Sequence, residues 1–263
     1  MFGSYVAIGD SFTEGLGDWY PDGTPRGWAD RLAEALSLRF REDAEKPSED
    51  TFEYANLAIR GRKLRPIIDE QLMPAIAASP DLISFAAGGN DMLRPKFNPE
   101  QAVEAAVGVV QKIRDAGIHA LVLSGPDPVN NLPMGATFSA RGAEYSQIAA
   151  ERLGPMEGVT FVDNFHDRAF EDSTYWSEDG LHLDSAGHLR ITANVLGVLG
   201  VDYPEGWEDP RSPAPDPKNY RTPEYFAKYI APWVGRRLTG RSSGDGRTAK
   251  RPELSAFPEA PNA

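Results

Sequence analysis

The sequence has 263 residues, a formal net charge of −12 and no cysteine. This length suits one compact domain of roughly 200 residues with an appendage, and the lack of cysteine excludes disulfides and thiolate metal sites. The acidic balance argues against nucleic acid or an anionic membrane as a partner. No apolar run approaches the roughly 18 residues of a membrane span, and no signal peptide is visible, so we expect a cytoplasmic protein. Nothing in the composition fixes the oligomeric state.

Short apolar segments alternate with helical patterns along most of the chain. The segments predicted as strands are 4–9, 52–57, 81–86, 119–124 and 159–163. Amphipathic spacing predicts helices over 27–41, 64–77, 100–116, 139–153 and 185–199. This alternation is typical of a parallel sheet that helices cover on both faces. We therefore expect a three-layer α/β/α domain over residues 1–203, with a five-stranded parallel sheet.

A proline-rich extension is expected over residues 204–263, which hold ten of the 22 prolines. Within it, the segment 223–238 places Tyr225, Tyr229 and Trp233 four residues apart. An aromatic stripe at this spacing predicts a helix that docks on the main domain. Pro232 is expected to kink or end that helix.

The end of the extension is basic. Residues 236–263 carry six basic and three acidic side chains, a net charge of +3, which leaves −15 for residues 1–235 given the total of −12. The segment 240–263 is rich in Gly, Ser, Pro and Arg, so we expect it to be disordered and solvated.

The carboxyl ends of the strands are where sites form in an open parallel sheet. Each predicted strand leads into a polar segment there: Gly9-Asp10-Ser11, "NLAIRGR" with Gly61, "AAGGNDM" with Asn90, "SGPDP", and a loop with "SEDGLHLDSAGH".

Each of these residues alone has a structural interpretation. Ser11 could cap the helix that follows, and Asp10 is expected to accept a hydrogen bond from a backbone N–H of the turn. Asn90 could satisfy backbone groups in a tight turn. Gly61 could be a turn glycine with positive φ, and His182 a polar residue at a helix entrance.

Together the same residues could form a nucleophilic site. A serine needs a base to become a nucleophile, and the base needs an orienting acid. Of the four histidines, His182 is the one in a loop at the strand-end face with an acid, Asp179, three residues before it. That spacing lets one short loop hold the carboxylate against one ring nitrogen while the other faces Ser11. The Ser11 and Gly61 N–H groups and the Asn90 amide could then donate to an oxyanion.

The blocks "GDSFTEG", "NLAIRG", "GGND" and "DGLH" resemble, in the same order, the four blocks of the SGNH hydrolases, also called the GDSL lipase/esterase family. The resemblance covers about residues 4–200, and Phe12 departs from the leucine of the family name. It implies a flavodoxin-like strand order, with Ser11 as nucleophile, His182 as base and Asp179 as its partner. It also implies an oxyanion hole of Ser11, Gly61 and Asn90.

We therefore expect a serine hydrolase that cleaves carboxylic esters through an acyl-serine, without a metal or organic cofactor. The expected substrates are acyl or acetyl esters of small molecules, lipids or sugars. Two alternatives stay open. One is a non-catalytic carbohydrate-binding protein on the same fold. The other is a metal-dependent phosphoryl-transfer enzyme that uses Asp10 as nucleophile; position 12 is Phe, so the second aspartate of such enzymes is missing.

Overall fold

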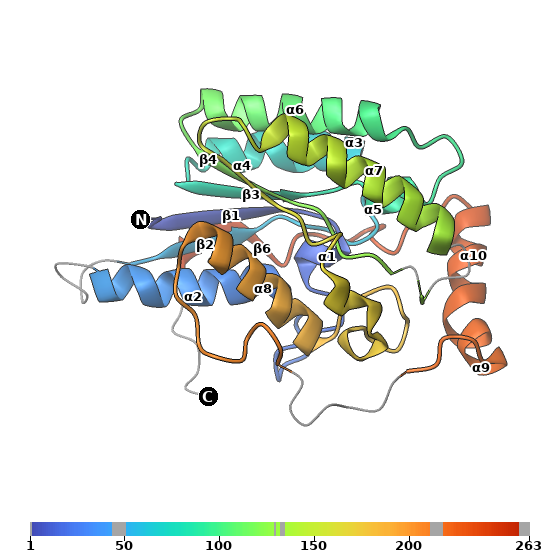
Figure 1. Cartoon of the computed structure of the whole chain (residues 1–263). Coiled ribbons are helices and arrows are strands. Elements are labelled where there is room, and N and C mark those ends of the chain that lie inside the picture. The colour runs from blue at the N-terminus through green and yellow to red at the C-terminus, as the bar shows by residue number, and fades with distance from the viewer. Residues whose placement is uncertain (1, 44–50, 129, 132–134, 211–217, 258–263) are drawn as a thin grey trace.

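The computed structural model describes residues 2–43, 51–128, 130–131, 135–210 and 218–257. A single sheet crosses the molecule in the order β5-β4-β3-β1-β2-β6 (Figure 1). Its strands are β1 (Ser4–Gly9), β2 (Glu53–Asn56), β3 (Leu82–Ala86), β4 (His119–Leu123), β5 (Val159–Val162) and β6 (Arg251–Ala256). The first five pair in parallel, which confirms the predicted flavodoxin-like order, and β6 adds an antiparallel pair at the β2 edge.

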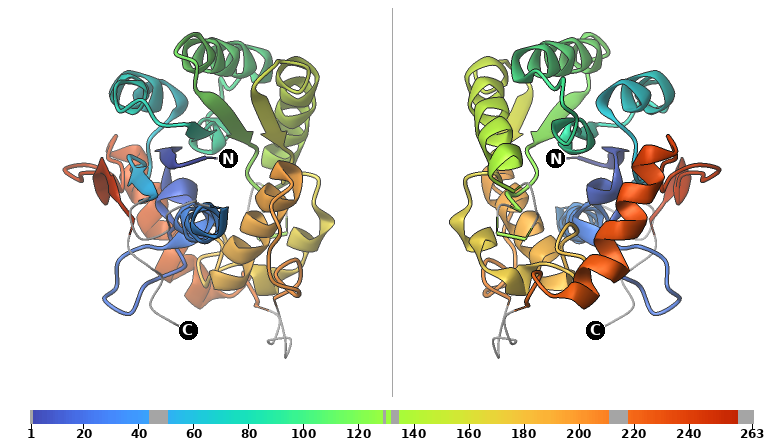
Figure 2. Two further views of the ribbon diagram at one scale, coloured as in Figure 1. Left: turned by 90° about the vertical axis from the view of Figure 1, so that its left-hand side faces the viewer. Right: turned by 90° about the vertical axis from the view of Figure 1, so that its right-hand side faces the viewer.

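Helices cover both faces of the sheet, as the alternating pattern predicted (Figures 1 and 2). One face carries α3 (Leu64–Ile67), α4 (Met73–Ala77), α6 (Pro99–Asp115) and α7 (Gly135–Leu153), and the other carries α2 (Gly27–Asp43) and α8 (Ser185–Leu199). Strand β1 contributes Val6 and Ile8 to the first core and Tyr5 and Ala7 to the second. Because successive side chains of a strand point to opposite faces, a continuous apolar run marks burial on both sides.

The remaining short elements connect longer helices, lie at the carboxyl end of the sheet or belong to the extension. They are α1 (Ser11–Glu14), α5 (Gly89–Met92), the 3-10 turns η2 (Arg168–Glu171) and η3 (Ser173–Tyr175), the π turns η1 (Ile68–Leu72) and η4 (Phe226–Ile230), α9 (Pro223–Tyr225) and α10 (Ala231–Leu238). Among the described residues, no helix combines the length and apolarity that a membrane crossing requires.

Residues 223–238 form one helical rod made of α9, η4 and α10. Pro232 was expected to kink or end this helix. The helix continues past it as α10, and the winding changes to the π turn η4 just before the proline, where an α-helical N–H donor is missing. The predicted helix over 64–77 also contains a π turn before a proline, because η1 ends two residues before Pro74. The domain boundary at residue 203 stays a prediction.

The expected disorder of residues 240–263 is wrong for the part that the structure describes. Residues 251–256 form β6 on the edge of β2, and the buried Phe257 ring packs edge-on against Tyr54 at 5.1 Å. Lys250 pairs with Asp30 at 2.8 Å, and both side chains are less than 10% exposed. The prediction of disorder from composition fails because two anchoring residues, Lys250 and Phe257, and the open edge of β2 are enough to order the segment. Residues 258–263 lie outside the described residues.

Candidate active site

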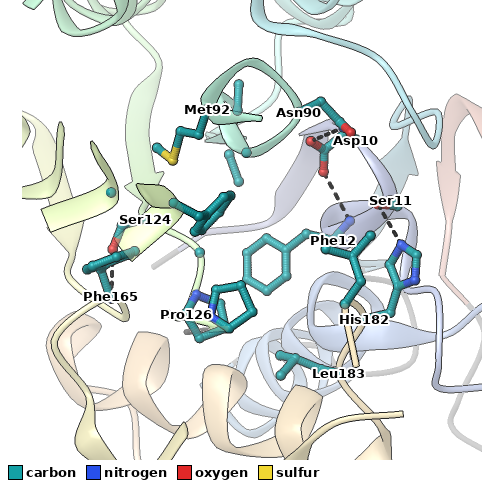
Figure 3. Close-up of a pocket in the computed structure, with 18 of the residues that line it drawn as sticks. Asp10, Ser11, Phe12, Asn90, Met92, Ser124, Pro126, Phe165, His182 and Leu183 are labelled. Atoms are coloured by element: carbon teal, nitrogen blue, oxygen red, sulfur yellow. Dashed lines mark hydrogen bonds between the residues drawn. The ribbon is translucent and has the colours of Figure 1, made fainter. Parts of the chain in front are cut away.

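The turn after β1 presents Ser11 at the start of α1. The cap of this helix is Asp10, whose Oδ1 accepts a hydrogen bond from the Phe12 N–H at 3.1 Å. This confirms the turn role expected for Asp10, and it leaves the Ser11 hydroxyl free of a capping role. Ser11 Oγ instead lies 3.0 Å from His182 Nε2 (Figure 3).

His182 and Asp179 come from one loop between η3 and α8. Asp179 Oδ2 lies 2.6 Å from His182 Nδ1, and its Oδ1 accepts from Ser177 Oγ and from the Leu181 and His182 N–H groups at 2.7–3.0 Å. Burial alone would raise the pKa of Asp179, but the His182 ring and these N–H donors outweigh it and hold the pKa well below its ordinary value. The carboxylate thus keeps the proton of the neutral imidazole on Nδ1, and this hydrogen-bond network assigns Nε2 as the acceptor for the Ser11 hydroxyl.

Asn90, in α5, is hydrogen-bonded to Asp10, the residue that precedes Ser11. Its Nδ2 donates to Asp10 Oδ2 at 2.9 Å and to the Arg62 carbonyl at 3.0 Å. Burial raises the pKa of Asp10 to about 6. The Phe12 N–H, the His182 ring and the Asn90 amide favour the charged carboxylate and offset part of this rise. Both amide hydrogens of Asn90 are therefore engaged in this state.

Gly61 lies in the turn that follows β2, with φ of +74°, a backbone conformation that favours glycine. Its carbonyl accepts from Ser242 Oγ at 3.3 Å, and a Cβ at this position would lie 2.3 Å from that same oxygen. The extension therefore packs directly on this turn. The structure brings Ser11, Asp179 and His182 into one hydrogen-bonded chain. It bonds Asn90 to Asp10, the sequence neighbour of Ser11, and to the carbonyl of Arg62, the sequence neighbour of Gly61.

An apolar pocket of about 110 Å³ opens beside Ser11 and His182. Figure 3 shows Phe12, Met92, Phe165 and Leu183 around it, with Ser11, Asp10 and Asn90 at one side. Hydrocarbon and aromatic side chains from several segments of the chain line most of it, which suits an apolar group of a ligand. The further lining residues include Leu16, Leu93, Pro126, Phe138, Tyr145, Trp176 and Leu181.

Two side-chain contacts that hold the nucleophile turn have no local sequence signal. The buried Gln71 accepts from the Gly9 N–H at 2.8 Å and donates to the Gly9 carbonyl at 3.0 Å. Glu14, in α1, forms an ion pair with Arg60 and accepts from its backbone N–H at 2.6 Å. These partners lie 46 and 62 residues apart in sequence, so only the fold reveals them.

The extension also holds the loop of His182. Tyr225 donates through its hydroxyl to the Asp179 carbonyl at 2.8 Å, and Tyr220 donates to the Ser177 carbonyl at 2.8 Å. Tyr229 donates to Glu178 Oε2 at 2.6 Å. The rod of α9, η4 and α10 therefore lies across the carboxyl end of the sheet, as the right-hand view of Figure 2 shows.

Solved structures similar to this one include several hydrolases. The lipase Lip_vut3 from a goat rumen metagenome aligns with a TM-score of 0.56 at 18% identity, over 77% of this chain and 98% of that one. The acetylxylan esterase Axe2 from Geobacillus stearothermophilus aligns with a TM-score of 0.55 at 19% identity, over 76% and 94%. TesA aligns with a TM-score of 0.55 at 23% identity, over 74% and 97%. At these identities the likeness concerns the fold.

Comparison by sequence goes further. The uncharacterized protein YpmR of Bacillus subtilis (strain 168) is 31% identical over 216 residues, which cover 74% of this chain and 80% of YpmR. The model of the GDSL-like lipase/acylhydrolase family matches residues 7–190, a range that contains Ser11, Gly61, Asn90, Asp179 and His182. The chain thus belongs to the GDSL-like lipase/acylhydrolase family.

Proposed function

We propose that this protein is a serine esterase that cleaves carboxylic esters through an acyl-serine intermediate. The observation that carries the proposal is the continuous chain from Ser11 Oγ through His182 to Asp179, with contacts of 3.0 and 2.6 Å. Family membership and the lipase and esterase structures of similar fold support ester hydrolysis in general. A cytoplasmic location stays a prediction.

The first half of the reaction transfers the acyl group to the enzyme. Ser11 Oγ attacks the ester carbonyl carbon while its proton passes to His182 Nε2. The tetrahedral intermediate collapses, the bond to the alcohol oxygen breaks, and that oxygen takes the proton from His182. Asp179 keeps the ring oriented and stabilises the imidazolium while it exists. The alcohol leaves, and the acyl group stays on Ser11.

The second half returns the enzyme to its starting state. Water loses a proton to His182 Nε2 and attacks the acyl carbon. The new intermediate expels Ser11 Oγ, which recovers its proton from His182, and the carboxylic acid leaves. The apolar pocket beside Ser11 suits the acyl chain, because burying hydrocarbon surface contributes about 25 cal/mol per Å².

Ser11, Gly61 and Asn90 are proposed to stabilise the oxyanion. The Asn90 amide serves this role by exchanging its bond to the Arg62 carbonyl for one to the substrate oxygen. Nucleophilic attack by Asp10, the alternative mechanism, is disfavoured because this residue is buried and both of its carboxylate oxygens accept hydrogen bonds.

The nucleophile is tested with aryl esters of increasing acyl length and with acetylated sugars. Ser11→Ala should abolish turnover of every ester while the melting temperature stays near that of the wild type. Ser255→Ala, an exposed serine of β6, is the matched control and should keep full activity. A phosphonate ester should label the wild type at Ser11 with one equivalent. Sugar binding without turnover by the wild type would instead favour the carbohydrate-binding alternative.

A further inference from the structure

A second cavity of about 70 Å³ lies between the main domain and the extension. We call it the basic cavity. The main domain lines it with Gly61, Lys63, Asn90, Leu93 and Arg94, and the extension lines it with Trp233, Arg236, Arg241, Ser242 and Ser243. Figures 1 and 2 place α10, which carries part of this lining, at the same end of the sheet as α1 and α5.

Four cationic side chains converge on the basic cavity in a protein with a net charge of −12: Lys63, Arg94, Arg236 and Arg241. Within the described ranges, none of the four forms an ion pair with a carboxylate. Cations gathered in a concave site focus the field there and attract an anion.

Two acids lie close to these cations, and both accept backbone hydrogen bonds. Asp91 Oδ2 accepts from the Leu64 N–H at 2.8 Å, and Asp245 Oδ2 accepts from the Ser242 N–H at 2.9 Å. They offset part of the positive charge. A third carboxylate, Asp10, accepts from Asn90 of the lining at 2.9 Å. The four cations outnumber these three carboxylates, and the surplus of positive charge favours an anion such as a phosphate monoester, which carries roughly −1.5 to −2 at neutral pH.

The donors in the basic cavity also suit a phosphate. Each arginine presents a planar fork of N–H groups that fits two oxygens of one phosphate, and the hydroxyl of Ser243 adds a neutral donor. Trp233 and Leu93 form an apolar part of the same wall, against which the carbon skeleton that carries the phosphate packs.

The basic cavity is continuous in its lining with the proposed active site. Asn90 and Leu93 line both this cavity and the apolar pocket of Ser11. Gly61, from the turn proposed to stabilise the oxyanion, lines it as well. An ester with its acyl chain in the apolar pocket and its carbonyl at Ser11 would pass Asn90 and Leu93 if its alcohol portion extended into the basic cavity.

We propose that the basic cavity binds a phosphate carried on the alcohol portion of the substrate, so that the enzyme prefers acyl esters of phosphorylated alcohols. This inference rests on the proposed esterase function and names its substrate class. Half of the lining belongs to the extension, outside the family match at residues 7–190, so family membership alone does not imply this preference.

Binding is tested first without turnover. Ser11→Ala is titrated by calorimetry with glycerol 3-phosphate, and with glycerol as the neutral control. We expect saturable binding of the phosphate compound alone, lost in Ser11→Ala combined with Arg236→Gln and Arg241→Gln. Ser11→Ala combined with Arg152→Gln and Arg168→Gln is the matched charge control, since both of these arginines lie on the exposed surface. Equal binding by the two triple variants, or no binding at all, would overturn the phosphate site.

Kinetics then test the substrate class with 1-butyrylglycerol 3-phosphate and 1-butyrylglycerol. We expect kcat/KM of the wild type to be at least about tenfold higher for the phosphorylated ester, and this ratio to fall to about one in Arg236→Gln/Arg241→Gln. The control Arg152→Gln/Arg168→Gln should keep the wild-type ratio and turn over the neutral ester within about twofold of the wild type, because both arginines lie on the exposed surface away from the reacting atoms. Equal kcat/KM for the two esters in the wild type would refute the preference.

Failure of the esterase proposal looks different, because neither ester would then be cleaved while phosphate binding to the basic cavity persists. Two acyl lengths, compared in the same assay, identify whether the phosphate belongs to a small soluble ester or to a lipid headgroup. A preference that is present with butyryl and lost with oleoyl glycerol 3-phosphate points to a small soluble ester, and one that is strongest with the oleoyl compound points to a lipid headgroup. Either result supports the phosphate site.

Discussion

Asp10 and Asn90 join the nucleophile turn to the loop after β3. Asp10 caps α1 with one carboxylate oxygen and accepts from Asn90 with the other. The side chain of Asn90 therefore has a structural partner and, in our proposal, a catalytic one. Substitution separates the two roles because one acts on the free energy of unfolding and the other on turnover.

Asn90→Ala should lower kcat by about a hundredfold, which corresponds to about 2.7 kcal/mol, with little change in KM. It should also lower the free energy of unfolding by about 1–3 kcal/mol, because the buried Asp10 loses a donor. Asn98→Ala is the control, since it removes the cap of α6 without touching the site. A folded Asn90→Ala enzyme with normal kcat would contradict the oxyanion role.

His188 is a buried histidine whose two ring nitrogens serve structure. Nδ1 accepts from the Trp28 N–H at 3.1 Å, and Nε2 donates to the Leu16 carbonyl at 3.0 Å. Burial lowers its pKa from 6.5 to about 4. Between these two values the unfolded chain takes up a proton that the folded protein does not, so the stabilising contribution is complete above pH 6.5 and is lost as the pH falls toward 4.

Denaturant titrations of the wild type and His188→Gln at several pH values check this. The difference in free energy of unfolding should shrink by up to about 3 kcal/mol between pH 7 and pH 4, since each pKa unit corresponds to 1.36 kcal/mol. Taking the difference removes the opposite trend of Asp10, whose raised pKa destabilises the fold as the pH rises from 4 to 6. A constant difference would mean that His188 is not buried in its neutral form.

At the scale of elements, the extension contacts both loops of the proposed site. The rod of α9, η4 and α10 holds the Asp179 loop through tyrosine hydroxyls. The segment after it packs on the turn of Gly61, where Gly244 has no room for a side chain: a Cβ there would lie 2.0 Å from the Arg60 carbonyl oxygen. The position of Gly61 therefore depends on residues more than 180 positions away.

Gly244→Ala should displace either Arg60 or the extension, and so lower both kcat/KM and the melting temperature. Gly108→Ala provides the matched control, because Gly108 is exposed in α6 with open space at its Cβ position. That control should keep its activity and gain up to about 1 kcal/mol, since alanine is the better helix former. Unchanged ester turnover in Gly244→Ala would show that the extension does not position this turn.

The elements that could be predicted from sequence are those with a local pattern. The strands of the main domain were readable because burial on both faces gives continuous apolar runs, and Asp179 with His182 because three residues of spacing fit one loop. The hydrogen bond from Asn90 to Asp10 joins residues 80 positions apart, and no local pattern encodes it. Strand β6 was missed because its ordering depends on Lys250 and Phe257, two anchors within a polar segment.

For the molecule as a whole, the pair of Lys250 and Asp30 fastens the extension to the main domain. Lys250 Nζ also donates to the carbonyls of Pro25 and Arg26 at 2.8 and 2.9 Å. Burial raises the pKa of Asp30 and lowers that of Lys250, so it opposes both charges, and the mutual attraction of the pair offsets that cost. Removing one partner leaves an unpaired charge inside the protein.

Lys250→Met should therefore lower the free energy of unfolding by about 3–5 kcal/mol, the typical effect of breaking a buried ion pair. Adding Asp30→Asn should restore much of the loss, because no lone carboxylate then stays buried. Urea unfolding of the single and double variants measures both quantities. If Lys250→Met proved as stable as the wild type, the buried ion pair would not fasten the extension.

The antiparallel strand β6 also covers the edge of the sheet at β2, which bears on self-association of the protein. Without it, β2 would present a row of free N–H and C=O groups to other chains, which is how sheets from different molecules join and aggregate. Strand β6 covers that row and is itself a poor template, because Pro252 lacks an N–H and the exposed Glu253 brings a charge to the edge. A chain shortened before residue 250 would therefore have a greater tendency to self-associate, independently of any loss of catalysis.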